Sequence, residues 1–254
     1  MTRKLTRIFG ALSLCVLTAL VTLFGQGYVR YRRELDEVPL EEATGVYTGN
    51  TDYVSYEEID EDFVHAVISV EDKRFFERKG YDLIALCRAL YHNFLAKDFV
   101  EGGSTITEQI AKNLYMEGYV SGLEEKTAEI FILFALEKKY SKEELFALYA
   151  NMNYYGDGYW GIREAAKGYY GCDPDDLSLG QAAILAGIPN APAIYQLSTG
   201  YDEAKERQEW VLQTMVNNRY ISEEEMAQAL AEDVHPIKKQ RSRRRTHHDP
   251  QHLF

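Results

Sequence analysis

The run from Gly102 to Asn113, GGSTITEQIAKN, contains the residue types needed to hold an anionic ligand close to the backbone. Two glycines allow close approach to the main chain, and Thr105 followed by Glu108 predicts a capping box that opens a helix whose first amides are free. On that helix Gln109 and Lys112 share a face with Thr105, whereas the isoleucines form a core-facing stripe. The alternative interpretation is a capped surface helix without a ligand.

Glu71 is a candidate catalytic base because it interrupts an apolar helical stripe. It falls within about 60° of Val64, Ile68 and Phe75 on a helical wheel, so its carboxyl should be partly desolvated. Desolvation raises the pKa of a carboxyl group and makes it a stronger base. Alternatively, Glu71 ends its helix and turns to water or pairs with a nearby arginine.

Glu129 is a second candidate carboxylate, at the start of the apolar run IFILFAL. The length of this segment and its flanking Glu and Lys residues favour a helix that is apolar on all sides and buried, although a buried strand has the same periodicity. A charge in such a helix needs a partner, and Lys126 lies three residues earlier on the same face. A purely structural ion pair is the competing explanation.

These segments occur in a fixed order along the chain. The order is EDKRFFERKG from Glu71, the run 102–113, Lys126 with Glu129, Tyr149-Ala150-Asn151 with Tyr155-Gly156, and LSLGQAAILAGIP over 177–189. This ordered set resembles the family 51 glycosyltransferases, the peptidoglycan transglycosylases that polymerise lipid II. The similarity extends from about Tyr53 to Tyr195, and the second motif matches at every defined position except Glu108.

The resemblance implies a mainly α fold, with a lysozyme-like helical lobe beside a smaller membrane-proximal lobe, preceded by one N-terminal transmembrane helix. The residues independently predict a mostly helical domain, because S-x-x-E/Q capping boxes recur and alternating strand patterns are scarce. These boxes are Ser55 with Glu58, Ser141 with Glu144, Ser178 with Gln181, and Ser222 with Glu225.

The resemblance also implies a reaction. Lipid II units would be joined through β-1,4 bonds, with release of undecaprenyl pyrophosphate. Glu71 would take the proton of the attacking hydroxyl in an inverting displacement, and Glu129 would hold the cations in register. The residues carried over as substrate-binding are Asp72, Arg74, Phe75, Ser104, Thr105, Gln109, Lys112, Asn113 and Lys126.

No cofactor is required by this reaction, although a divalent cation at the pyrophosphate, Mg²⁺ or Mn²⁺, is left open and would be held by Glu129. The histidines and cysteines show no metal-ligand or disulfide spacing, so we expect no structural metal site. Lys112 and Lys126 are the leading candidates to stabilise the charge that accumulates on the departing pyrophosphate.

Four positions depart from the family pattern, and each changes the charge. They are Arg78 in place of histidine, Glu108 in place of glutamine, Glu125 in place of arginine and Ala147 in place of glutamate. The added carboxylates should weaken pyrophosphate binding unless an arginine or a metal compensates, and Arg78 is a candidate substitute cation. Two rival functions therefore remain, a lysozyme-like lytic transglycosylase or hydrolase and a degenerate, non-catalytic cell-wall scaffold.

The chain divides into five predicted segments. They are a cytoplasmic basic tip over 1–7, a transmembrane anchor over 8–29, a polar linker over 30–50, the glycosyltransferase domain over 51–232, and a basic, disordered tail over 233–254. A cleaved signal peptide is the alternative to the anchor, but no small-x-small cleavage site is evident. The charges flanking the span are balanced, so the resemblance alone places the domain on the extracytoplasmic side of the cell membrane.

The net charge of −12 argues against nucleic acid as a partner. The resemblance implies that the partners are lipid II, the growing glycan strand and the membrane, and it leaves room for cell-wall synthesis proteins. The residues after Tyr195 are too few for the penicillin-binding transpeptidase domain that larger members carry, so we expect a monofunctional chain.

Overall fold

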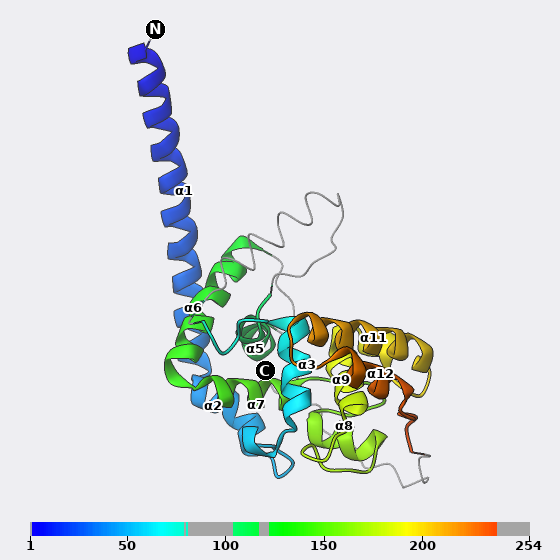
Figure 1. Cartoon of the computed structure of the whole chain (residues 1–254). Helices are drawn as coiled ribbons and strands as arrows, with labels where there is room; N and C mark the ends of the chain where they lie inside the picture. Colours follow the sequence, from blue (N-terminus) through cyan, green and yellow to red (C-terminus); the bar gives the residue numbers. More distant parts are fainter. Residues whose placement is uncertain (1, 79, 81–103, 117–121, 238–254) are drawn as a thin grey trace.

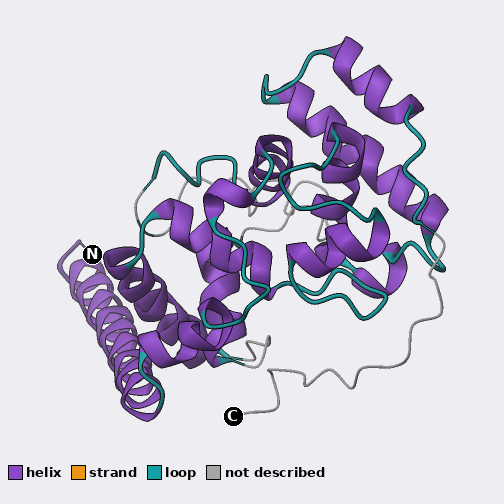
Figure 2. Ribbon diagram, turned by 90° about the horizontal axis from the view of Figure 1, so that it is seen from below, coloured by secondary structure: helices purple, strands orange, loops and turns teal. Residues whose placement is uncertain are grey.

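The computed structural model describes residues 2–78, 80, 104–116 and 122–237, and this part of the chain is helical throughout (Figure 2). The helices are α1 (Thr2–Glu37), α2 (Leu40–Thr48), η1 (Tyr56–Glu58), α3 (Glu61–Glu71), α5 (Ile106–Tyr115), α6 (Leu123–Lys139), α7 (Lys142–Met152), α8 (Ile162–Tyr169), α9 (Leu179–Gly187), η2 (Ile188–Asn190), α10 (Pro192–Tyr195), α11 (Tyr201–Asn217) and α12 (Glu223–Ala231). Within the described ranges the only β-type pairing is an isolated bridge between Tyr154 and Trp160. The predicted mainly α fold is confirmed.

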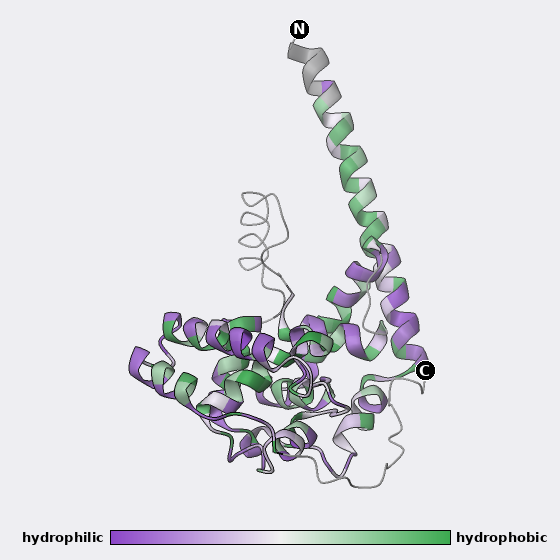
Figure 3. Cartoon of the chain, turned by 90° about the vertical axis from the view of Figure 1, so that its right-hand side faces the viewer, coloured by the Kyte–Doolittle hydropathy of each residue, from purple (hydrophilic) through white to green (hydrophobic). Residues whose placement is uncertain are grey.

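Helix α1 projects from the body of the molecule and is mostly apolar along its outer part (Figures 1 and 3). The segment Phe9–Glu37 is long and apolar enough to cross a membrane, which fits the predicted anchor. The predicted linker over 30–50 is mostly helical, because α1 continues to Glu37 and α2 begins at Leu40. Pro39 separates the two helices, since it cannot continue α1 and suits the start of α2.

The inner part of α1 packs against α6. Gly27 lies directly against Thr127, so a Cβ atom at Gly27 would overlap the threonine side chain. The ring of Phe131 lies 5.4 Å from that of Tyr28, centre to centre, in an edge-to-face contact. Arg30 forms an ion pair of 3.0 Å with Glu125. The glutamate that stands in place of the family's arginine therefore has a structural partner on α1. The apolar helix is therefore part of the packed fold.

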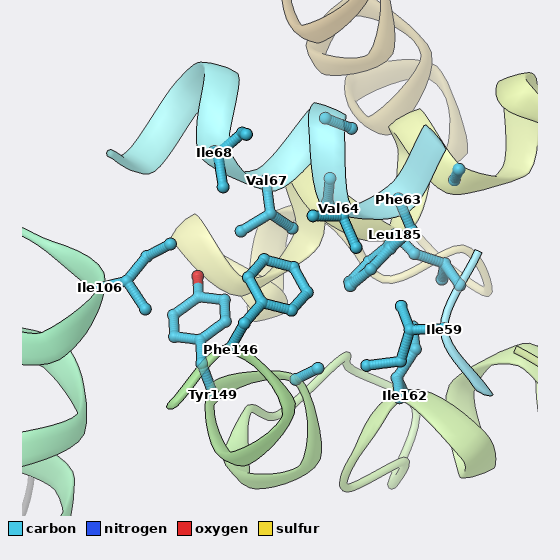
Figure 4. Packing of buried hydrophobic residues seen from close by; sticks show 14 of the residues in the cluster. Ile59, Phe63, Val64, Val67, Ile68, Ile106, Phe146, Tyr149, Ile162 and Leu185 are labelled. Atoms are coloured by element: carbon cyan, nitrogen blue, oxygen red, sulfur yellow. The ribbon is translucent and has the colours of Figure 1, made fainter. Parts of the chain in front are cut away.

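The core lies where α3, α7 and α9 meet, with α5 on one side (Figure 4). Val64 and Ile68 of α3 are each 4% exposed, so the predicted apolar stripe is confirmed. Phe146 and Tyr149 of α7 point into the same cluster. Helix α11 covers α3 and α9 on the other side (Figure 1). The C-terminal end of α3, which carries Glu71, is held between these elements.

Capping boxes start four of these α-helices, as the sequence predicts. Thr105 opens α5, Ser141 α7, Ser178 α9 and Ser222 α12, and in each case the N3 side chain returns to the cap backbone. The segment from Leu123 is helical, so the strand alternative is excluded. Its expected burial on all sides is wrong, because Phe134 is 51% exposed.

Candidate active site

Glu71 is the last residue of α3 and lies beside α5. Its carboxylate accepts a hydrogen bond of 2.6 Å from the Gln109 side-chain amide. Gln109 is positioned by the capping box that starts α5, because Thr105 and Glu108 fix the first turn of that helix. The sequence places these two residues far apart, and the fold joins them as expected for a base and a residue that orients it.

Burial raises the pKa of Glu71 above the ordinary range of a glutamate. The hydrogen bond from Gln109 and the positive charges of Arg207 and Lys112 oppose this increase, whereas the neighbouring Asp72 adds to it. The site therefore contains a carboxyl whose basicity is increased by desolvation, facing cations from two helices. Such a group suits proton abstraction.

Asp72 is the C-cap residue of α3, directly after Glu71, and its side chain points into the protein. Its carboxylate accepts the Ile106 backbone N–H at 3.3 Å and is paired with Arg78. Its side chain is only 2% exposed, so it holds the start of α5 against the end of α3. The described contacts give Asp72 a positioning role beside Glu71, in contrast to the direct substrate contact predicted from the sequence.

Arg78 and Phe75 are also buried. The Arg78 guanidinium is 8% exposed and bridges Asp72 to Glu137, so its charge is engaged within the protein. Its role as a substitute substrate cation stays a prediction. Phe75 has no exposed surface, and its ring packs on Phe76 at 5.0 Å. The observed contacts of Phe75 are those of a core residue, and its direct contact with substrate stays a prediction.

A second charged cluster joins α5 to α6. The Lys126 ammonium donates hydrogen bonds of 2.7 Å to Glu108 and 2.7 Å to Glu129. Both carboxylates are almost fully buried, while Lys126 is 36% exposed. Burial raises the pKa of Glu129, and the positive charge of Lys126 partly opposes this increase. For Lys126, burial alone would lower the pKa, but the hydrogen bonds and charges of Glu108 and Glu129 raise it above the ordinary value. Two acidic groups thus surround one cation.

This cluster does not fit a divalent cation as it stands. The ammonium of Lys126 occupies the position between the two carboxylates that a metal would need. No group of three or more metal-ligating side chains occurs among the described residues. A metal at Glu129 would have to displace Lys126, so no chemical step below depends on one.

The remaining predicted residues lie along α5 and its approach. Lys112 and Asn113 are half-buried and Ser104 is exposed. Thr105 is 2% exposed and its hydroxyl accepts the Glu108 backbone N–H, so its observed contact is structural. Arg74 is half-buried in the turn after α3. Gly102 and Gly103 lie outside the described residues, as does the tail from 238 onwards.

Arg207 of α11 is a site residue that the sequence analysis did not identify. Its charge acts on Glu71, and the guanidinium carbon lies 4.0 Å from the centre of the Trp210 ring. No local motif marks Arg207, because its relation to Glu71 arises only when α11 packs across α3. The spacing of Arg and Trp by three residues on one helical face was the only available signal.

Comparison with known proteins agrees with this geometry. A family model described as Transglycosylase matches residues 36–216. Penicillin-binding protein 1F of Bacillus subtilis (strain 168) is 37% identical over 241 residues, covering 89% of this chain and 34% of that protein. Penicillin-binding protein 1A of Aquifex aeolicus (strain VF5) is 37% identical over 178 residues, covering 70% of this chain and 24% of that protein. The chain thus spans well under half the length of each relative.

A crystal structure of penicillin-binding protein 1A from Haemophilus influenzae is 34% identical in sequence. It aligns over 42% of this chain and 16% of that chain, with a TM-score of 0.37. The match to the family model extends from the end of α1 into α11 and includes both charged clusters. The chain therefore belongs to the transglycosylase family, the family 51 glycosyltransferases whose domain is also found in class A penicillin-binding proteins.

Proposed function

We propose that this chain is a peptidoglycan glycosyltransferase that polymerises lipid II into β-1,4-linked glycan, with Glu71 as the general base. The observation that carries the proposal is the environment of the Glu71 carboxyl. It is desolvated, oriented by Gln109 at 2.6 Å, and influenced by the charges of Lys112 and Arg207. A base for a hydroxyl and a cationic surrounding for a departing anion are the two requirements of this transfer.

The proposed step is a direct displacement. The acceptor sugar's 4-hydroxyl oxygen attacks the anomeric carbon of the donor, and Glu71 takes the hydroxyl proton. The bond between the anomeric carbon and the pyrophosphate oxygen breaks, and its electron pair leaves with undecaprenyl pyrophosphate. The attack comes from the face opposite the leaving group, so the configuration inverts and no second carboxylate nucleophile is needed.

The cations near the site differ in their availability. Lys112 has no hydrogen bond or ion pair to another described residue, and its charge acts on Glu71. Lys126 already has two carboxylate partners, so the local charge around it is negative. Lys112 is therefore the better candidate for the first contact with the pyrophosphate. Lys126, which Glu108 of α5 and Glu129 of its own helix hold in place, offers its exposed side as a second contact. Ser104 and Asn113 remain candidates for contacts with substrate oxygens.

The apolar part of α1 fits a single-pass membrane anchor. Since lipid II carries its sugars on the outer face of the membrane, the domain would act on the extracytoplasmic side of the cell membrane. The partners under this proposal are lipid II, the growing strand and other proteins of cell-wall synthesis.

The test is a polymerisation assay on the detergent-solubilised full chain with lipid II, run with and without a chelator. The wild-type chain should produce long glycan and lose little activity with the chelator, whereas Glu71→Gln should reduce the rate by at least about 100-fold. Glu77→Gln is the matched control, because Glu77 is exposed in the turn that follows Glu71. Its rate should equal that of the wild type.

Two outcomes would overturn the proposal. A wild-type chain that makes no polymer but cleaves preformed peptidoglycan would be a lytic enzyme. A chain inert in both assays would support a non-catalytic scaffold. If Glu71→Gln polymerised as fast as Glu77→Gln, the function would stand and the assignment of the base would be wrong.

A further inference from the structure

Trp210 is an exposed aromatic residue on α11, the helix that packs on α3. It is 46% exposed and lies one helical turn beyond Arg207, whose guanidinium stacks on its ring at 4.0 Å. Isolated exposed aromatic residues are common on protein surfaces and need no functional explanation. The argument therefore depends on Arg207 and on what lies around it.

The Arg207 side chain is held in place but lacks polar partners. Its stem passes over Gly187, where a Cβ atom would lie only 2.8 Å from the arginine Cγ. The Arg207 Nε atom is buried without a hydrogen-bond partner. Among the described residues no hydrogen bond or ion pair to this side chain is found. A buried N–H donor without a partner is costly, so a ligand that accepted hydrogen bonds from this guanidinium would be favoured.

Arg207 also connects Trp210 to the reaction centre. Burial lowers the pKa of Arg207, while the negative charge of Glu71 and the half-buried Tyr195 oppose this. Helix α11 crosses the end of α3 where Glu71 lies (Figure 1). Gln109 and Lys112 approach Glu71 from α5, whereas Arg207 approaches it from α11. Arg207, with the Trp210 ring stacked on its guanidinium, thus lies on a second helix within electrostatic reach of the carboxyl.

We infer that Trp210 and Arg207 form a saccharide-binding subsite beside Glu71, for the N-acetylhexosamine ring that presents the attacking hydroxyl. The C–H face of the ring packs on the exposed indole, and Arg207 donates hydrogen bonds to hydroxyl or acetamide oxygens. Because Glu71 offsets the charge of Arg207, a neutral sugar fits this position better than a second anion. The identity of the sugar as an acceptor depends on the proposed function.

The chain contains two tryptophans, Trp160 and Trp210, so each can be observed alone. The Trp160→Phe variant of the full chain in detergent leaves Trp210 as the only indole fluorophore. Its emission should change saturably when a β-1,4-linked N-acetylglucosamine oligomer is added. The Trp210→Phe variant leaves Trp160, which packs on Tyr154 at 4.8 Å between ring centres, and its emission should not change.

Polymerisation kinetics provide the second measurement. Trp210→Ala should raise KM for lipid II about tenfold with a much smaller effect on kcat, because it removes stacking in the ground state and the transition state alike. Trp160→Phe should have wild-type constants, and circular dichroism should show that both variants are folded.

The outcomes distinguish this inference from the proposed function. If wild type polymerises lipid II but the Trp210 emission stays constant and Trp210→Ala keeps its KM, the subsite is refuted and the enzyme assignment stands. If the Trp210 emission responds to the oligomer but no polymer forms, the subsite stands and the proposed function fails. A response confined to Trp160 would also refute the subsite.

Discussion

Replacing Glu108 by glutamine should strengthen binding of the pyrophosphate-bearing substrate. Glu108 makes two contacts, one to the Thr105 backbone N–H at 2.8 Å and one to Lys126 at 2.7 Å. A glutamine oxygen can still accept the Thr105 N–H, so the capping box should persist. The substitution removes one negative charge from the cluster around Lys126 and leaves a neutral Lys126–Glu129 pair.

The magnitude follows from the position of that charge. A phosphate oxygen that meets Lys126 on its exposed side would lie about 6 Å from the Glu108 carboxylate. Repulsion of a dianionic pyrophosphate at this distance is about 1.4 kcal/mol even with the dielectric constant of water, and larger in a partly buried site. Glu108→Gln should therefore lower KM at least about tenfold. The effect should shrink at high ionic strength.

The assay is initial-rate polymerisation at varied lipid II concentration, at low and high salt. Glu144→Gln is the matched control, because Glu144 plays the same capping-box role at the start of α7. That variant should leave KM unchanged. If Glu108→Gln left KM unchanged or raised it while its melting temperature matched the wild type, the substrate's phosphates would not approach Lys126, and the electrostatic reasoning would fail.

Three further predictions concern stability and pH. Because burial raises the pKa of Glu71, the acid limb of the pH–rate profile should lie above the ordinary carboxyl range. The native state also holds this proton more tightly than the unfolded chain does, so the free energy of unfolding should fall as pH rises from the unfolded-state pKa to the native-state pKa of Glu71. Urea titrations of Glu71→Gln at several pH values should lack that fall. Gly27→Val should lower the free energy of unfolding by about 1–3 kcal/mol through overlap with Thr127, whereas Gly25→Val, which has open space, should melt like the wild type. Arg78→Ala should cost about 3–5 kcal/mol in denaturant unfolding because it leaves the buried Asp72 carboxylate without its ion-pair partner, whereas Glu137 keeps Lys142. An unchanged stability with a raised KM would instead identify Arg78 as a substrate cation.

Features set by short-range patterns were predictable from the sequence. The capping boxes at Thr105, Ser141, Ser178 and Ser222 depend on residues three positions apart, and all four form. The apolar stripe of α3 likewise placed Glu71 at the edge of the core. Family motifs then related Glu71 to Gln109, a contact that no local pattern contains.

Features set by long-range packing were not predictable in the same way. Polarity after residue 30 suggested a linker, yet the same stretch carries helical pairs at i and i+4, Arg30 with Glu34 and Arg32 with Asp36. The burial of Arg78 follows from Glu137 on another helix, and the role of Arg207 follows from how α11 crosses α3. Ion pairs between residues that are distant in the chain cannot be inferred from a single sequence.

The contact between α1 and α6 bears on how this protein can be handled and how it meets its substrate. A truncation that removed α1 to obtain a soluble form would uncover Phe131 and Thr127 on the same helix that carries Lys126 and Glu129. Loss of activity in such a fragment could then result from the disturbed packing of α6 as well as from the loss of the anchor. Under the proposed anchoring, the packing of α6 on the same continuous helix would hold the carboxylates of α6 at a constant distance from the bilayer, within reach of a lipid-linked substrate.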